Sequence, residues 1–189
     1  MAKAWTYPIG LVALALAAVP SAAQAAPAPA ITSDTTLKFG EKGVLNMDGW
    51  DPKSEKFKAR KSPVAVRVLK IDKGKAADVK KLRLPAAASG MVPYYIRAEL
   101  SYAGADFTGS GPLFDGAFSD GSSSTALITS EDVGPCANTD TVTLDKKHKT
   151  VLQCTAVLAP AKVPVVSAYL FYSVSEHKSV KVSWTKSGE

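Results

Sequence analysis

The chain has 189 residues, with 23 Lys and Arg against 17 Asp and Glu, two His, two Cys and an apolar share of 46%. It is too short for two ordinary domains with their linkers, and too apolar for a wholly disordered chain. Many of the apolar residues lie in the first thirty positions, which we expect not to belong to the folded protein. The composition therefore predicts one mildly basic domain that follows a processed segment.

The N-terminal segment has the three parts of a secretory signal peptide. Lys3 gives a basic start, an apolar run extends from Ile9 to Val19, and small residues follow Pro20 as far as Ala25. The run is shorter than the roughly 20 residues that a membrane anchor needs, and it lacks a polar face of helical period. We therefore predict a signal peptide over residues 1–25, cleaved after Ala25, and secretion of the mature chain.

The mature chain begins with a Pro/Ala-rich stretch, residues 26–35, which predicts an extended linker. A single domain is expected over residues 36–189. Short β-prone runs alternate there with clusters of Gly, Pro, Asp and Ser, and no segment of ten or more residues shows a helical period. This rhythm is typical of an all-β fold, and it predicts an antiparallel sandwich of two sheets.

Two runs show the strand pattern most clearly. From Pro93 to Tyr102 an apolar face alternates with a charged one, and the leading proline fits the first residue of a strand. From Val64 to Ile71 we expect valines and Lys70 on one face, with Arg67 and Ile71 on the other. Further strands are expected at residues 36–40, 44–47, 141–144, 151–158, 165–172 and 180–184.

Three connecting segments are less regular. Residues 78–84 fit either a short helical turn or an irregular strand, and both alternatives stay open. Residues 104–134, rich in Gly, Ser and Asp, predict a loop with one or two short strands. Residues 145–149 carry the charges Asp-Lys-Lys-His-Lys between two β-prone runs, which predicts the tip of a hairpin.

The two cysteines, Cys136 and Cys154, both lie in the mature chain. Export to an oxidising compartment makes a disulfide between them the expected state. It would stabilise the fold by roughly 3 kcal/mol in the chain-entropy description. A thiol nucleophile or a metal site is disfavoured, because neither histidine stands at a recognisable spacing from these cysteines.

The order of several short motifs along the chain carries a family resemblance. They are Leu37 to Glu41, Val68 to Gly74 ahead of Asp78-Val79, Pro93 to Arg97, Gly134-Pro135-Cys136, Leu152-Gln153-Cys154 and Val182-Ser183-Trp184. In this order the chain resembles small secreted actinobacterial proteins with an immunoglobulin-like sandwich, related to the mycobacterial antigen MPT63 and to the DUF4352 group. The similarity spans roughly Thr36 to Thr185. It implies an immunoglobulin-like fold and a secreted setting, but no activity.

Catalytic chemistry finds little support in the sequence. His148 and His177 both fall in expected turns, and neither belongs to a zinc or hydrolase motif. A carboxylate pair or a calcium site among Asp115, Asp120, Glu131 and Asp132 is a weaker alternative, since acidic residues beside Gly are commonly turn formers. We therefore predict a protein that is not an enzyme and has no cofactor.

Basic residues gather in three clusters, which would attract a polyanion if they shared one face. They are Lys53, Lys56, Lys58, Arg60 and Lys61, then Lys73, Lys75, Lys80, Lys81 and Arg83, then Lys146, Lys147 and Lys149. A merely solvated surface is the competing interpretation. The third cluster is the polyanion contact that we expect.

We predict a secreted, non-catalytic binding module at or beyond the cell surface. Its expected partner is a protein or an anionic cell-wall polymer, and neither nucleic acid nor a transmembrane segment in the mature protein is expected. The main alternative is an inhibitor of extracellular proteases that presents the loop from Gly104 to Gly121. A calcium-dependent module or a carboxylate-site enzyme is the remaining one.

Overall fold

The computed structural model describes residues 29–51, 59–80, 82, 84–128, 132–137 and 141–186. These residues form eleven strands and two short 3-10 turns. The strands are β1 (Thr35–Lys38), β2 (Gly43–Trp50), β3 (Ala59–Lys73), β4 (Met91–Tyr102), β5 (Phe107–Gly109), β6 (Asp115–Phe118), β7 (Ser123–Ser124), β8 (Val142–Leu144), β9 (Thr150–Pro160), β10 (Val165–Ser175) and β11 (Lys178–Thr185); the turns are η1 (Ala76–Val79) and η2 (Ala86–Ala88). The predicted signal peptide lies outside the described residues, as do Lys53, Lys56, Lys58, Lys81, Arg83 and Glu131.

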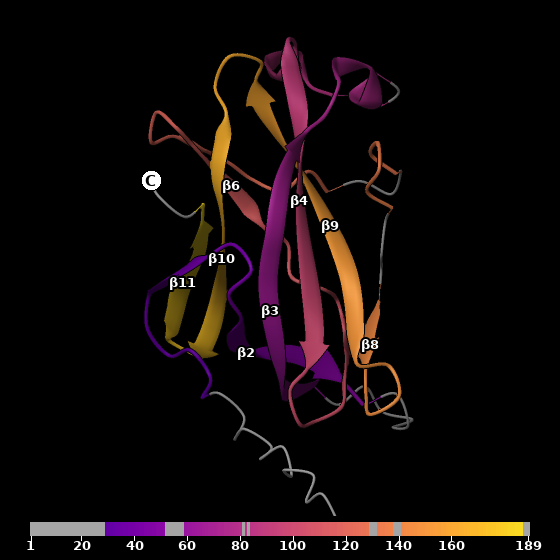
Figure 1. Cartoon of the computed structure of the whole chain (residues 1–189), viewed down its shortest axis with the longest axis vertical. Helices are drawn as coiled ribbons and strands as arrows, with labels where there is room; N and C mark the ends of the chain where they lie inside the picture. Colours follow the sequence, from indigo (N-terminus) through magenta and orange to yellow (C-terminus); the bar gives the residue numbers. More distant parts are fainter. Residues whose placement is uncertain are drawn as a thin grey trace, which may run out of the picture.

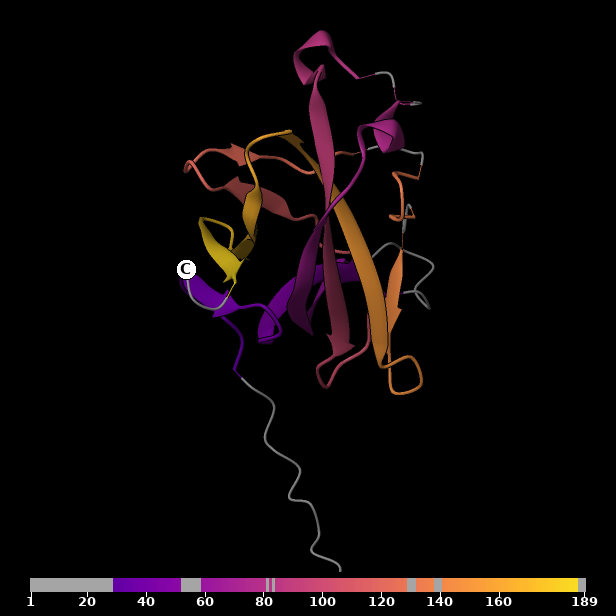
Figure 2. The ribbon, with the colours of Figure 1, turned by 45° about the horizontal axis from the view of Figure 1, so that its top comes forward.

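The strands build two main sheets, which confirms the predicted β-sandwich. One sheet has four strands in the order β2-β3-β4-β9, and the other has five in the order β1-β11-β10-β6-β7. β5 and β8 form a separate two-stranded sheet. In Figures 1 and 2 the long strands β3, β4 and β9 run side by side, and β10 and β11 lie beside them. Pairing is antiparallel except between β1 and β11, which are parallel.

The core lies between the two main sheets. Val64, Val66 and Val68 point inward from β3, and alternate residues of β4 do the same. Trp184 of β11 is fully buried, with its ring edge-on to Phe114 at 5.8 Å between centroids. Its indole N–H donates to the Glu41 carbonyl at 3.1 Å, so the polar atom of this large side chain is satisfied.

β3 departs from the predicted alternation at Leu69. The register with β4 shifts between Val68 and Lys70, which marks a β-bulge. Because the bulge reverses the alternation, Lys70 pairs with Arg97 on the outer face and Ile71 packs against the core. The expectation that Lys70 shares the valine face and Ile71 the Arg67 face is therefore wrong.

β4 confirms the alternation expected for its sequence, but it begins at Met91, two residues before the proline. It lies between β3 and β9. Tyr94, Ile96 and Leu100 point into the core, while Arg97 and Glu99 lie on the outer face. This central strand therefore presents its charged side chains on the outer surface of the sheet.

The charged segment 145–149 is not the tip of a hairpin. β8 pairs with β5 rather than with β9, so the segment connects two different sheets. Val142 and Leu144 of β8 are buried together with Phe107 of β5, and this apolar contact explains why β8 leaves β9. Sequence proximity alone had favoured the local pairing.

The region from Gly104 to Gly134 is more structured than predicted. It contains β5, β6 and β7, and it buries Phe107, Phe114 and Phe118 in the core. The segment from Gly104 to Gly121 is therefore not a free loop of the kind that protease inhibitors present. At the other end of the chain, Ala30 forms a parallel bridge with Val44, within the stretch predicted to be a linker.

Candidate functional site: the outer face of the four-stranded sheet

The outer face of the four-stranded sheet has two unlike halves. On one half, η1 and residues 132–137 pack on the strands, and residues 126–128 lie at the edge of β9, where Ala126 bridges Val157; we call these segments the cover. On the other half, which we call the open half, the side chains of Arg67, Leu69, Lys70, Arg97, Glu99, Ser101 and Leu152 share one surface. Asp72 lies at the boundary, in register with Tyr95.

The covered half is centred on Tyr95. Its side chain is 3% exposed and packs with Val79, Val133 and Ala156 in a second apolar cluster, separate from the main core. The Tyr95 hydroxyl donates to Asp78 Oδ2 at 2.8 Å, and the Lys75 backbone N–H donates to the same oxygen at 2.9 Å. The second cluster therefore has its own polar anchor at the end of η1.

The electrostatics of this anchor follow from the two hydrogen bonds. The Lys75 N–H, followed by the Tyr95 hydroxyl, lowers the pKa of Asp78. Burial, reinforced by the hydrogen bond to the Asp78 carboxylate, raises the pKa of Tyr95 well above its usual value. Asp78 is therefore charged and Tyr95 neutral at physiological pH, which is the pairing that the hydrogen bond requires.

Close contact with the tyrosine requires a residue without a side chain at position 134. Gly134 has a φ of +57°, and a Cβ atom there would collide with the Tyr95 hydroxyl. Glycine suits both conditions, since it adopts positive φ without penalty and leaves room for the ring. The turn at Gly134 thus brings Val133 and Cys136 down onto the sheet.

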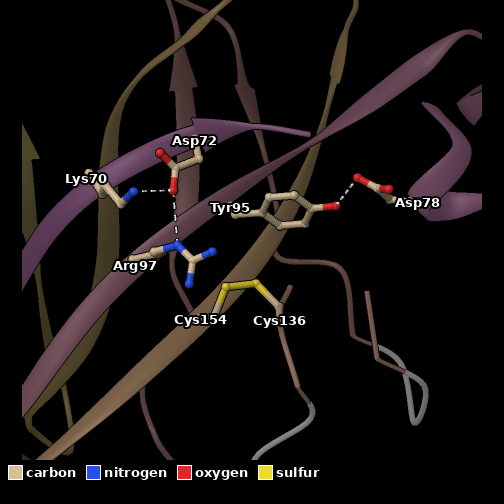
Figure 3. Close-up of a disulfide and its surroundings, with 7 residues drawn as sticks. All are labelled: Lys70, Asp72, Asp78, Tyr95, Arg97, Cys136 and Cys154. Carbon is tan, nitrogen blue, oxygen red and sulfur yellow. Dashed lines mark hydrogen bonds and ion pairs between the residues drawn. A yellow bond between two sulfur atoms is a disulfide. The ribbon is translucent and has the colours of Figure 1, made fainter. Parts of the chain in front are cut away.

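The disulfide between Cys136 and Cys154 is formed, as predicted. Cys154 lies on the outer face of β9, in register with Arg97 of β4, so the bond fastens the cover to the sheet at its boundary with the open half. Figure 3 shows the disulfide together with the Tyr95–Asp78 and Arg97–Asp72 contacts. The disulfide therefore lies where the covered half of this sheet face meets the open half.

Glu99 organises the charges at one end of the open half. Arg67 Nη2 donates to Glu99 Oε2 at 2.7 Å, and the Ser101 hydroxyl donates to Oε1 at 3.0 Å. The Lys42 ammonium lies 3.7 Å from the same carboxylate. The hydrogen bond from Arg67 is the main reason that the pKa of Glu99 is lowered, so the carboxylate stays charged and holds the guanidinium in place.

Asp72 has a similar role for Arg97. Its Oδ2 accepts hydrogen bonds from Arg97 Nε at 3.0 Å and from Lys70 Nζ at 2.9 Å (Figure 3). Partial burial opposes ionisation, but the hydrogen bonds from Lys70 and Arg97 outweigh it and lower the pKa of Asp72. Because Asp72 binds Arg97 through Nε, the two terminal nitrogens of this guanidinium point away from the bond, as Figure 3 shows.

Leucine side chains lie among these charges. Leu152, which pairs with Glu99 across β4 and β9, is 72% exposed, and Leu69 at the bulge is 36% exposed. Beside them is a hollow of about 250 Å³, bounded by Leu69, Arg97, Leu152, Pro135 and Cys154. The open half thus combines apolar contact area with fixed guanidinium groups, the two features enriched at protein interaction surfaces.

The predicted polyanion contact, Lys146, Lys147 and Lys149, lies in the turn before β9. Asp145 accepts the backbone N–H groups of Lys147 at 2.7 Å and His148 at 2.6 Å, and contacts His148 Nδ1 at 3.1 Å. These bonds, those from His148 first, lower the pKa of Asp145 to about 2. The lysines therefore stand on an ordered turn that contains a permanent negative charge.

This turn adjoins the open half. Thr150, directly after Lys149, pairs with Ser101 of β4, and the Tyr102 N–H donates to the Lys149 carbonyl at 2.8 Å. Arg60, Lys61, Lys73, Lys75 and Lys80 from the other predicted clusters belong to β3 or to the residues that follow it. Of these, Lys61 contacts the Ser173 carbonyl and Asp48, and Lys73 donates to the Ala161 carbonyl, so neither of these two joins the charges of the open half.

Two of the carboxylates proposed for the catalytic alternatives bond to neighbouring segments of the chain. Asp115 Oδ1 accepts the Ala126 N–H and so ties β6 to residue 126, and Asp120 accepts the backbone N–H and the hydroxyl of Ser122 and so stabilises a turn. His148 is exposed at its turn, and His177 lies in the turn between β10 and β11. Across the described ranges, no three His, Cys, Asp or Glu side chains are grouped to hold a metal ion. Within the same ranges, no helix has the length and apolar character needed to cross a membrane.

Sequence pattern alone does not group Arg67, Arg97 and Leu152. They come from three different strands and meet only because β3, β4 and β9 are neighbours in this register. The alternation of β4 did place Arg97 and Glu99 on one face, which was the available signal. The pairing of Arg67 with Glu99 required the register.

Together, the fold and the cysteine bridge define an immunoglobulin-like two-sheet β-sandwich with one disulfide. No protein-family model matches the chain, and no curated protein sequence matches it. A search of solved structures found the crystal structure of MPT63, a secreted protein from Mycobacterium tuberculosis, with a TM-score of 0.51 and 11% sequence identity. The match covers 82% of this chain and 99% of MPT63. The resemblance to that protein is thereby confirmed at the level of the fold, while a relation to the DUF4352 group stays a prediction.

Proposed function

We propose that the mature chain is a secreted, non-catalytic binding module that holds its partner against the open half. The observation that carries this proposal is Leu152, a large apolar side chain 72% exposed on the outer face of β9, next to the guanidinium groups that Glu99 and Asp72 hold in place. A partner that covers Leu152 would remove its apolar surface from water, and the neighbouring charges would fix the partner's orientation.

The charge of this surface indicates what the partner carries. Four cationic groups, Lys42, Arg67, Lys70 and Arg97, surround two carboxylates, Asp72 and Glu99, which leaves the surface positive. Lys146, Lys147 and Lys149 border it and add further positive charge. We therefore propose an anionic partner, an acidic protein or an anionic cell-wall polymer, with these three lysines steering its approach.

Secretion rests on two observations. The first residues have the pattern of a signal peptide, which we propose is cleaved after Ala25. The cysteines form a disulfide, a bond that persists in oxidising compartments. The fold likeness to a secreted protein agrees with this setting.

A capture experiment tests the proposed function. Mature protein from Ala26 to Glu189, with its disulfide intact, is immobilised and exposed to wall extract and culture fluid of the producing organism at low and high salt. We expect a component retained by the wild type, lost with Leu152→Glu and weakened by Arg97→Gln. Ile128→Glu, at an exposed apolar residue outside the open half, is the matched control.

The outcome of the capture experiment decides between a protein partner, attraction of a polyanion, and no role for the open half. Retention at high salt that depends on Leu152 supports a protein partner, because apolar contact is insensitive to screening. Retention only at low salt that depends on Lys146, Lys147 and Lys149 reduces the function to polyanion attraction. A component retained equally by Leu152→Glu and the wild type would overturn the assignment of the open half.

A further inference from the structure

A second surface lies at the edge of the sandwich, where β2 and β10 face each other. Between them is a hollow of about 290 Å³, lined by Leu45–Asp48, Leu170–Ser173 and the pair Pro112-Leu113. This volume is at the lower end of the roughly 300–1,000 Å³ that ligand pockets span. Figure 1 shows β2 crossing the lower ends of β3 and β4. The hollow does not include any residue of the open half.

β2 is an edge strand, and the direction of its backbone groups can be deduced. In an antiparallel pair, residues alternate between those that exchange both hydrogen bonds with the partner strand and those whose N–H and C=O point away. The Ile31 N–H donates to the Val44 carbonyl at 2.8 Å, so Val44 points away from β3. By alternation, Asn46 and Asp48 point the same way.

A proline confirms this alternation independently. Pro63 of β3 is opposite Asn46 in the register, and a proline has no N–H to exchange. The Asn46–Pro63 pair is therefore not hydrogen-bonded across the two strands. The Asn46 N–H and C=O consequently face the free edge of β2, on the side where the hollow lies.

The chain itself already uses this edge once. Ala30 bridges Val44 in parallel, as an added strand would, and then the chain leaves β2 to form β1 beside β11. Among the described strands, β2 pairs with β3 alone, and β6 pairs with β10 only over Val165–Tyr169. The edge next to the Ala30 bridge is thus open over Asn46.

Side chains at the hollow are suited to an apolar residue. Leu45 and Leu170 form its buried floor, while Leu113 is 51% and Phe171 63% exposed at its walls. At the far end, Lys61 Nζ donates to the Ser173 carbonyl at 2.9 Å and lies 3.9 Å from Asp48. Exposed apolar walls beside an open strand edge are the elements of recognition by strand addition.

We propose that this edge binds an extended peptide segment of a partner protein, which continues the strand pairing begun by Ala30 and places one apolar side chain between Leu113 and Phe171. Main-chain hydrogen bonds to Asn46 provide the pairing, and the hollow selects the side chain. This inference is independent of the open half, because the two surfaces share no residue.

Panning a displayed library of random heptapeptides on the immobilised mature protein tests the proposal. We expect enriched peptides with an apolar residue inside an extended run, bound at least tenfold more weakly by Asn46→Pro. The proline removes the outward N–H and leaves the bonds to β3 intact, so the variant should fold; thermal unfolding checks this. Asn46→Ala keeps the N–H and is the matched control.

A second measurement does not depend on the proline variant. N-methylation of an enriched peptide at successive positions should abolish binding at alternate residues only, since alternate N–H groups face β2. Phe171→Ser should weaken binding, and Leu152→Ser should not. The absence of enriched peptides, or equal binding by Asn46→Pro and Asn46→Ala, would overturn the proposal. Dimerisation of the wild type that Asn46→Pro abolishes would assign the edge to a second copy and overturn it too.

Discussion

The two halves of the outer face are built from the same three strands, yet one is buried and the other exposed. Leu152 and Leu158 lie on the same face of β9, six residues apart; Leu152 is 72% exposed, whereas Leu158 packs against the cluster around Tyr95. The strands therefore do not decide which leucine is covered. Leu158 is covered because the cover, a segment distant in sequence, is held over it by the disulfide and by the turn at Gly134.

The largest expected effect comes from removing the bond that separates the halves. Replacing both Cys136 and Cys154 with Ala should lower the free energy of unfolding by about 3 kcal/mol. The reason is that the bond, which joins residues 18 positions apart, no longer restricts the unfolded chain. Urea unfolding followed by tryptophan fluorescence measures the loss. Hydrogen exchange should rise in β9 near Ala156 more than near Leu152. An unchanged unfolding midpoint would show that the cover is held without the disulfide.

The next test compares the two leucines directly. Leu158→Ser should destabilise the fold by about 1–2 kcal/mol, since it removes apolar area from the second cluster. Leu152→Ser should change stability by less than about 0.5 kcal/mol, as expected for an exposed position. Thermal or urea unfolding of the two variants side by side decides the matter. Equal losses would mean that Leu152 is also covered in solution.

A smaller effect is expected at the polar anchor of the cover. Tyr95→Phe keeps the ring but removes the hydrogen bond to Asp78, which should cost about 1 kcal/mol. Tyr102→Phe, at the other end of the same strand, is the control and should have a smaller effect. The variants are compared by their urea midpoints. If both tyrosine variants lose the same stability, the anchor contributes nothing specific.

The smallest effect concerns the charges of the open half. The pKa of Glu99 is lowered in the folded state, chiefly by Arg67, so its contribution to stability is present above its ordinary pKa of 4.5 and disappears as the pH falls through the folded value. Glu99→Gln should therefore flatten the loss of stability on acidification. Unfolding midpoints at a series of pH values from neutral to acidic measure the slope. Superimposable curves for the variant and wild type would contradict the Arg67–Glu99 pairing.

Sequence patterning predicted much of the fold because β-strands are recognisable by the alternation of apolar and polar residues. The inward residues of β4 and the strands expected at residues 165–172 and 180–184 follow from that period of two. The cysteine pair was predictable as well, since the chain contains only two cysteines and its first residues predict an export signal. The predicted alternation was wrong after Val68, where the bulge inserts one residue and reverses the faces of Lys70 and Ile71.

The sequence by itself determined the fold class, the disulfide and the charged outer face of β4, because each depends on local period or on composition. The tertiary structure alone decided that β8 joins β5, that Arg67 meets Glu99, and that the cover stops at Cys154. Those outcomes depend on register and on contacts between distant segments. Register is fixed by the sum of many small packing energies across neighbouring strands, and no single stretch of sequence contains that sum.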